Sequence, residues 1–245
     1  MKSIWGWNDI RIHPFTILLF IIAIYYKTYH FLLGGMVITI IHELFHYYFA
    51  KKYKFKTKKI TILPFGTNLV LLDYGQHHII EEFIVILAGL ISHFFIFLFL
   101  LFFFNHEEFL KMNALIFAFN LLPIYPLDGS KLILLFLSMV MDYQKAIKLQ
   151  IKISIFFISI CLMTIFKINM MLVFLFLIIE NYYYIKTYRV HIIRLLLSRR
   201  KPLYRKFHWN HNDDFYRTYQ NIYIQNNKCY NEAQKINDLL EKIVD

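Results

Sequence analysis

The sequence predicts an all-α polytopic membrane protein with about six transmembrane helices, and three observations lead to this fold class. Hydrophobic residues make up 58% of the 245 positions and mean hydropathy is +0.47, whereas a soluble domain is about half apolar. The apolar residues are concentrated in long runs, such as 94–104, where every position is apolar. Lysine and arginine gather beside these runs, which is the distribution that the positive-inside rule produces.

The predicted spans differ in length, and a run of roughly 20 apolar residues is enough to cross a bilayer as a helix. They are predicted at 14–29, 31–50, 79–104, 109–140, 151–166 and 168–185. Pro123 and Pro126 interrupt the fourth span, because proline cannot continue a regular helix. No small-residue cleavage site follows the first apolar run, so the first span is expected to be retained.

The basic residues between the spans predict the orientation in the membrane. Six lysines lie at 51–59, between the second and third spans, and further basic residues follow the fourth and sixth spans. Six spans with both chain termini in the cytosol satisfy this pattern. The formal net charge of +11 is therefore explained by attraction to anionic lipid, and nucleic acid is not expected as a partner.

One segment departs from the helical pattern. Residues 60–65 and 68–72 are short β-forming runs with Gly66 and Thr67 between them, which predicts a β-hairpin between the second and third spans. Pro64 restricts the hairpin to an edge or an irregular position. Its backbone groups need partners at the membrane, so we expect it to tuck against the helices. An interfacial loop is the alternative.

The chain is expected to divide into a transmembrane domain, 1–197, and a short polar cytosolic tail, 198–245. The tail is rich in Asn, Lys and Tyr, and its residues 231–244 predict one amphipathic helix. With about fifty residues the tail is too short for a substantial core of its own. Cys161 and Cys229 form no disulfide framework and are interpreted as free thiols.

The main functional signal is the motif His42-Glu43-x-x-His46 inside the second span. Positions i and i+4 share one face of a helix, so the two imidazoles can bind one metal ion while the carboxylate between them reaches the metal-bound water. Zinc lowers the pKa of such a water towards ~7, and a carboxylate can then take its proton. Ionisable side chains in an apolar span are costly and indicate function. A polar patch solvated by lipid headgroups is the alternative.

A catalytic zinc ion usually has three protein ligands, and Asp128 is the best candidate for the third. It lies in the segment Asn-Leu-Leu-Pro-Ile-Tyr-Pro-Leu-Asp-Gly, residues 120–129. The prolines and Gly129 predict a break in the span, and such breaks occur where irregular backbone lines a cavity. Asp128 would then begin the next helix. Taken alone, without the histidine pair, the segment is better explained as the end of the fourth span, with Asp128 capping an interfacial helix.

The His-Glu-x-x-His motif, followed about eighty residues later by Asn-x-x-Pro-x-x-Pro-Leu-Asp-Gly, resembles the site-2 protease family of intramembrane zinc metallopeptidases. The resemblance covers residues 31–129, and the six-span layout extends it to 185. It implies one Zn²⁺ ion held by His42, His46 and Asp128, with Glu43 as the catalytic base.

The resemblance also implies how a substrate is held. Residues 60–73 would form a membrane re-entrant hairpin that pairs with the substrate as an added strand, with Phe65 and Gly66 as substrate-binding residues. Asn120 is a further candidate: it could donate to the oxyanion of the intermediate or bind substrate backbone. Interhelical hydrogen bonding is an equal alternative for Asn120.

Within this family the sequence is most similar to the sporulation branch. That similarity implies regulated intramembrane proteolysis of the pro-sequence of a sigma factor, in the mother-cell or forespore-engulfing membrane, under the control of inhibitory membrane partner proteins. Two features depart from the branch. Gly89-Leu90 stands where members often carry Gly-Pro, and the tail is too short for the nucleotide-sensing cystathionine-β-synthase domain common in sporulation-type members.

Other readings of the same residues stay open. The enzyme could act on a different membrane-anchored regulator, or the intramembrane ionisable groups could belong to a metal transporter, or the chain could be an inactive scaffold. His93 lies in the third span and is interpreted as a packed, hydrogen-bonded histidine, with a place near the metal site as the alternative. His77-His78 and His208-x-x-His211 resemble metal-binding pairs but lie in polar segments, so they are interpreted as surface histidines.

Overall fold

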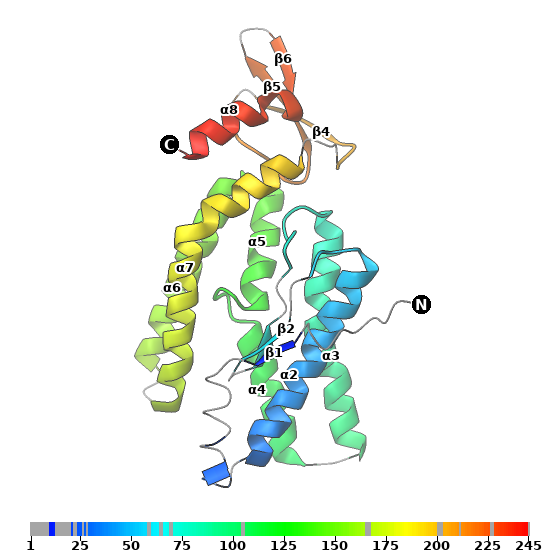
Figure 1. The fold of residues 1–245 in the computed structure, drawn as a ribbon, viewed down its shortest axis with the longest axis vertical. Helices are drawn as coiled ribbons and strands as arrows, with labels where there is room; N and C mark the ends of the chain where they lie inside the picture. The colour runs from blue at the N-terminus through cyan, green and yellow to red at the C-terminus, as the bar shows by residue number, and fades with distance from the viewer. Residues whose placement is uncertain are drawn as a thin grey trace. The chain divides into compact units, whose positions relative to one another are not determined.

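The computed structural model describes residues 10–12, 21, 24–25, 27, 29–57, 60–63, 66–68, 71–103, 106–164, 168–199, 203–210, 212–225 and 228–244. Helices dominate this part of the chain (Figure 1). Three of them are long and apolar enough to cross a membrane: α2 (Tyr29–Lys52), α3 (Ile79–Phe103) and the stretch Tyr143–Met163 of α6 (Tyr143–Thr164). The predominance of helices is thereby confirmed and the three candidate spans agree with a polytopic membrane protein, while the number of six spans stays a prediction.

The helices follow the predicted spans with some differences in length. The break in the fourth span is confirmed, because α4 (Glu107–Asn120) ends before the prolines and α5 (Asp128–Val140) begins after them. Helix α6 begins earlier than the predicted 151, and α7 (Ile168–Ser198) continues well beyond the predicted 185. Most of the first predicted span, 14–29, lies outside the described residues.

The chain separates into two compact units. The first consists of Met1–Tyr74 and Ile84–Asn120, and the second of Gly75–Phe83 and Leu121–Asp245. The predicted domain boundary between 197 and 198 stays a prediction.

The first unit contains helices α2 and α4, most of α3, and a small sheet. Strands β1 (Ile10–Ile12), β2 (Ile60–Leu63) and β3 (Gly66–Asn68) lie in the order β1-β2-β3. β1 is parallel to the central strand β2, and β2 is antiparallel to β3. The predicted pairing of two short strands between α2 and α3 is therefore present, while its re-entry into a membrane stays a prediction. Pro64 and Phe65, between β2 and β3, lie outside the described residues.

The end of α2 is anchored by apolar packing within the first unit. Ala50, Phe55 and Val85 form a buried cluster, which brings the last turn of α2 and the loop after it against α3. Burial of apolar surface is the main force that holds such elements together in a protein interior. The packing matters for function because α2 carries the histidine motif and α3 lies beside it.

The second unit contains three helices that pack side by side, α5, α6 and α7 (Figure 1). After α7 the tail forms a sheet of β4 (Phe207–Asn210), β5 (Gln220–Gln225) and β6 (Lys228–Asn231), with β5 in the centre. The amphipathic helix predicted at 231–244 is confirmed as α8 (Glu232–Val244). The sheet was not predicted, because its strands are short and polar. Its stability depends on tertiary contacts that sequence periodicity does not reveal.

Candidate metal centre

The two histidines of the motif lie one turn apart on α2 and are both buried. Their Nε2 atoms are 3.0 Å apart and their ring planes are nearly perpendicular, at 87°. Two nitrogen ligands of one tetrahedral zinc ion, each bound at ~2.0–2.1 Å, lie about 3.3 Å apart. The spacing of His42 and His46 therefore fits a shared ion.

The other ring nitrogen of each histidine is held by α3. His42 Nδ1 donates to the Gly89 carbonyl over 2.9 Å, and His46 Nδ1 donates to the Val85 carbonyl over 2.7 Å. A carbonyl only accepts hydrogen bonds, so each Nδ1 carries a proton. In a neutral imidazole with its proton on Nδ1, the Nε2 atom has the lone pair that a metal ion binds. This pattern of outward donors and inward lone pairs is the one that metal-binding histidines adopt.

Gly89 leaves room for the second imidazole. A Cβ atom at position 89 would lie 2.1 Å from Nε2 and 2.3 Å from Cε1 of His46, far inside van der Waals contact. Gly89 is thus a site residue whose role sequence reasoning missed. A glycine inside an apolar helix indicates close approach of a neighbouring element, and this signal could have identified it.

His93 is a third histidine beside this pair. Its ring centroid is 5.0 Å from that of His42, and its Nδ1 donates to Oδ1 of Asn113 over 2.8 Å. Asn113 in turn donates through Nδ2 to the His93 carbonyl, over 2.9 Å. The interpretation of His93 as a packed, hydrogen-bonded histidine is confirmed, and the ring also lies beside that of His42. Asn113 was missed, although an asparagine in the apolar part of α4 was the available signal.

Asp128 belongs to the second unit, where it is the first residue of α5 and is buried. The N-cap position is Leu127, and no side chain caps the helix, so the alternative of Asp128 as a capping residue is not supported. Its Oδ1 accepts a hydrogen bond from Lys131 Nζ over 2.8 Å. A carboxylate held in this way keeps a fixed orientation, as the ligands of metal sites commonly do.

Gly129 was predicted to provide backbone freedom, but in the structure it allows close packing of two backbone segments. A Cβ atom there would lie 2.1 Å from the carbonyl oxygen of Leu121 and 2.6 Å from that of Leu122. The start of α5 therefore packs directly on the backbone that follows α4. A larger residue at 129 would push α5, and Asp128 with it, away from this backbone.

The irregular segment before Asp128 is held by polar side chains from α6 and α7. Tyr125 N donates to Ser154 Oγ over 2.9 Å, and the Tyr125 carbonyl accepts from Asn181 Nδ2 over 2.7 Å. Ser154 Oγ also donates to Asn181 Oδ1, and the Tyr125 ring stacks on Tyr184 at a centroid distance of 4.0 Å. Non-helical backbone at membrane depth needs such partners. The sequence indicated that Ser154 is polar within an apolar span but not what it contacts.

The other predicted residues take the following places. Glu43 lies next to His42 on α2 and is half-buried, Asn120 ends α4 and Gly66 begins β3. Phe65 and His211 lie outside the described residues. The remaining polar-segment histidines make local contacts: His77 Nδ1 is 3.4 Å from Glu81, and the rings of His78 and His208 pack against Tyr204 and Tyr216.

Comparison with known proteins gives two relatives, and no family model matches the chain. The chain is 33% identical over 156 residues to stage IV sporulation protein FB of Bacillus subtilis (strain 168), which covers 60% of this chain and 54% of the relative. It is 32% identical over 124 residues to a zinc metalloprotease of Methanocaldococcus jannaschii, and this match covers 46% of this chain and 36% of the relative. The chain thus spans about half the length, or less, of these relatives. The resemblance to the sporulation branch of the site-2 proteases, stated from the motifs, is confirmed by these two similarities.

Proposed function

We propose that this chain is an intramembrane zinc metalloprotease of the site-2 protease type. The observation that carries the proposal is the histidine pair: His42 and His46 present their Nε2 atoms to one point, 3.0 Å apart, while α3 holds both Nδ1 atoms. The relative named as a zinc metalloprotease supports the same chemistry.

One Zn²⁺ ion is proposed to be held by His42, His46 and Asp128. Each of the three is buried, the histidines in the first unit and Asp128 in the second, and each offers one atom that can bind a metal ion. Two imidazoles and one carboxylate are a ligand set that suits a catalytic zinc ion, because they leave a position for water. A bound zinc ion supplies the positive charge that polarises a peptide carbonyl and lowers the pKa of water.

The chain's own residues then supply positioning and proton transfer. The Val85 and Gly89 carbonyls keep both imidazoles in the tautomer that offers Nε2. Glu43, adjacent to His42 on α2, is proposed to take a proton from the attacking water and to pass a proton to the leaving amine. The burial of both histidines keeps bulk water away from them, which strengthens every charge interaction at the site.

The substrate is proposed to enter as an extended strand. In the part of the chain that the structure describes, the sheet order β1-β2-β3 leaves β3, with Gly66 at its start, on an edge. An edge strand can pair with an added peptide through main-chain hydrogen bonds. Phe65 and Asn120 are proposed as further substrate contacts. A peptide bond held extended is accessible to attack, which a helical substrate in a membrane is not.

The biological setting is proposed from the first relative. Its name is that of a sporulation protein. Together with the motif resemblance, this leads us to propose the pro-sequence of a sporulation sigma factor as substrate and inhibitory membrane proteins as partners. Six spans in the lipid bilayer, with both termini in the cytosol, are proposed from the distribution of basic residues. A different membrane-anchored regulator is the alternative substrate.

A membrane metal transporter is the alternative from another class. It would need a continuous polar path through the helices. The buried polar groups of α6 and α7 instead form hydrogen bonds with one another and with α5: Ser154 with Asn181, and Gln150 with Tyr184 and with Ser130 of α5. Groups already bonded in this way brace a site, and this observation favours the protease.

A co-expression cleavage assay tests the proposal. A membrane-proximal sigma-factor pro-sequence is offered to the wild type, to Glu43→Gln and to Asp128→Asn, with the bound zinc measured for each. We expect only the wild type to cleave the substrate. Glu43→Gln should retain its bound zinc, whereas Asp128→Asn should bind zinc more weakly. Glu107→Gln serves as a matched control, because Glu107 is exposed and pairs with the exposed Lys111 on the same helix. Cleavage by Glu43→Gln at the normal rate would refute the mechanism.

A further inference from the structure

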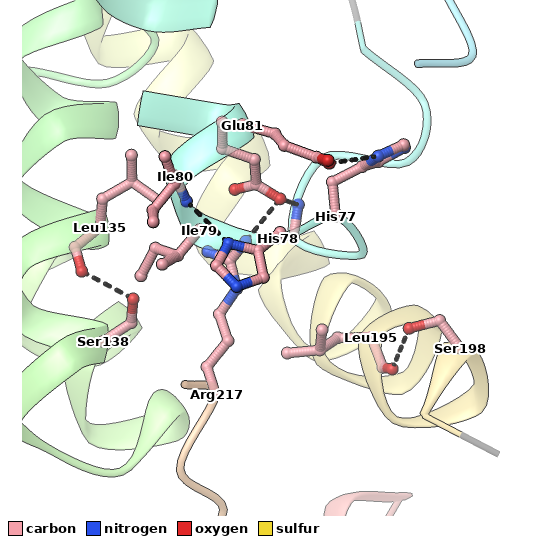
Figure 2. A network of polar contacts seen from close by, with 12 residues as sticks. His77, His78, Ile79, Ile80, Glu81, Leu135, Ser138, Leu195, Ser198 and Arg217 are labelled. Carbon is pink, nitrogen blue, oxygen red and sulfur yellow. Dashed lines mark hydrogen bonds and ion pairs between the residues drawn. The ribbon is translucent and has the colours of Figure 1, made fainter. Parts of the chain in front are cut away.

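The tail is joined to the first turn of α3 by a buried ion pair. Arg217, in the segment between β4 and β5, contacts the carboxylate of Glu82, and both side chains are fully buried. Glu82 Oε1 also accepts a hydrogen bond from Gly75 N over 2.8 Å. Figure 2 shows Arg217 extending from the tail towards His78 and Ile79 at the start of α3.

A pair of this kind constrains both of the segments that it joins. Each charge loses its hydration on burial and is tolerated only because the other lies against it. The Arg217 guanidinium also lies 5.7 Å from the centre of the Tyr143 ring, at the start of α6, and Arg199 donates a hydrogen bond to the Arg217 carbonyl. Arg217 therefore fixes the tail to the beginning of α3 and of α6 at one point.

Backbone contacts around the ion pair hold the same junction. Phe215 N donates to Asp142 Oδ1 over 2.7 Å, and the Phe215 carbonyl accepts from Tyr143 N over 3.0 Å. Ile79 N, in the first turn of α3, donates to the Tyr204 hydroxyl over 3.0 Å. Because the first amides of a helix have no partner within the helix, Tyr204 completes the start of α3.

The helix that the tail holds is the one that orients both histidines. α3 is one continuous helix from Ile79 to Phe103. Val85, whose carbonyl accepts from His46, lies three residues after Glu82, and Gly89, whose carbonyl accepts from His42, follows one turn later. A rotation or shift of the first turns of α3 moves these carbonyls, because helix backbone is stiff over such a distance.

We propose that Arg217 is a positioning residue of the metal centre: by holding Glu82 it sets the start of α3, and α3 sets the two imidazoles. The inference rests on the proposed function, since it takes His42 and His46 as ligands. The docked tail then contributes to the geometry of the metal centre. Its docking sets how well the metal is bound.

The test uses the full chain in detergent micelles with Co²⁺ in place of Zn²⁺, because the visible absorption of Co²⁺ reports ligand geometry. Arg217→Gln leaves Glu82 buried without its partner, and we expect Co²⁺ affinity to fall about ten-fold or more and the absorption band to change. In Glu82→Gln/Arg217→Gln both charges are gone and the two amides can bond to each other. We expect this double variant to recover most of the wild-type affinity and band.

Asp214→Asn is the matched control. Lys145 and Asp214 also join α6 to the tail, over 3.0 Å, but their side chains are 66% and 26% exposed. Exposed pairs contribute little, so the Co²⁺ band and affinity should stay as in the wild type. Chymotrypsin digestion of each variant reports in parallel whether the tail is docked, because its aromatic cleavage sites are the same in all of them.

The outcomes separate this inference from the proposed function. A wild type that binds no Co²⁺ contradicts the proposed function itself. A wild type that binds Co²⁺, with Arg217→Gln unchanged in affinity and band, overturns the inference, even where chymotrypsin shows the tail released. If Arg217→Gln does not fold, Arg217→Lys takes its place: it keeps the charge but not the planar fork, and a wild-type Co²⁺ band and affinity in this variant would equally overturn the inference.

Discussion

The imidazole of His46 occupies the space that a side chain at position 89 would need. A Cβ atom on Gly89 would lie 2.1 Å from His46 Nε2, while the carbonyl of the same Gly89 holds His42 through its Nδ1. One residue of α3 thus contributes to both imidazoles, by leaving room for one and by accepting a hydrogen bond from the other. Close approach of two helices is what makes both contacts possible at once.

The first prediction is that Gly89→Ala weakens metal binding. The added methyl group displaces the His46 ring from its position beside His42, so zinc affinity should fall by about ten-fold or more. Gly35→Ala is the control, because a Cβ atom at position 35 meets only the flexible Met112 side chain, at 3.4 Å. Zinc content after dialysis against a weak chelator measures both variants. Equal retention of zinc by Gly89→Ala and Gly35→Ala would contradict the geometry.

The second prediction concerns the segment before Asp128. Asn181→Leu removes the donor to the Tyr125 carbonyl and the acceptor for Ser154, so buried polar groups lose their partners. The cost should be about 1–3 kcal/mol of stability. The cleavage rate should fall by more than the loss of folded protein explains. The reason is that the segment before Asp128, at the start of α5, loses the hydrogen bonds that hold it in place. Thermal unfolding and initial cleavage rates, measured at a temperature where the variant is folded, give the two numbers.

Thr187→Ala on the same helix is the control for this experiment. Its hydroxyl donates to the Tyr183 carbonyl from an exposed position, so its loss should change neither quantity by more than about 0.5 kcal/mol. If Asn181→Leu and Thr187→Ala behave alike, the polar groups of α6 and α7 do not position Asp128. The transporter interpretation would then regain weight.

The third prediction is a pH dependence of the tail. Burial raises the pKa of the Glu232 carboxyl above its ordinary value, although hydrogen bonds from Asn221 and the nearby Arg199 favour the ionised form. A carboxyl whose pKa is raised by folding contributes stability below its ordinary pKa, and this contribution is lost as pH rises through the folded value. The tail should therefore become less protected as pH rises from about 4.

Hydrogen exchange of the β5 amides, compared between wild type and Glu232→Gln at each pH, measures this effect. The glutamine variant should show a smaller loss of protection over the same range, since it has no proton to release. Asp238→Asn is the control, because the Asp238 side chain is 59% exposed and pairs with Lys235. A wild-type tail that gains protection with rising pH would show that the assigned sign is wrong.

Local rules were enough to predict the elements that carry the chemistry. His42 and His46 face the same side because four residues make about one helical turn. The break before Asp128 follows from Pro123 and Pro126, which deny the helix its backbone donors. The helix at the end of the tail, α8, follows from its apolar period. Each of these depends on residues close in sequence, so periodicity and residue type reveal it.

The contacts that hold these elements join residues far apart in sequence. The Val85 and Gly89 carbonyls, which set the proton on each imidazole, lie 39 and 47 positions from the histidines that they hold. No pattern in the sequence pairs Ser154 with Tyr125, and none indicates the strands of the tail, whose pairing depends on neighbours and not on intrinsic preference.

By itself the sequence determined the motif, the helical membrane class and the break at Asp128, because these depend on local backbone geometry and on apolar length. Only the tertiary structure decided that Gly89 must be small, that α3 fixes both tautomers, and that Arg217 and Glu82 share a buried site. The physical reason is that excluded volume, hydrogen-bond partners and the loss of hydration are properties of the packed chain. These properties are defined only once segments far apart in the sequence are in contact.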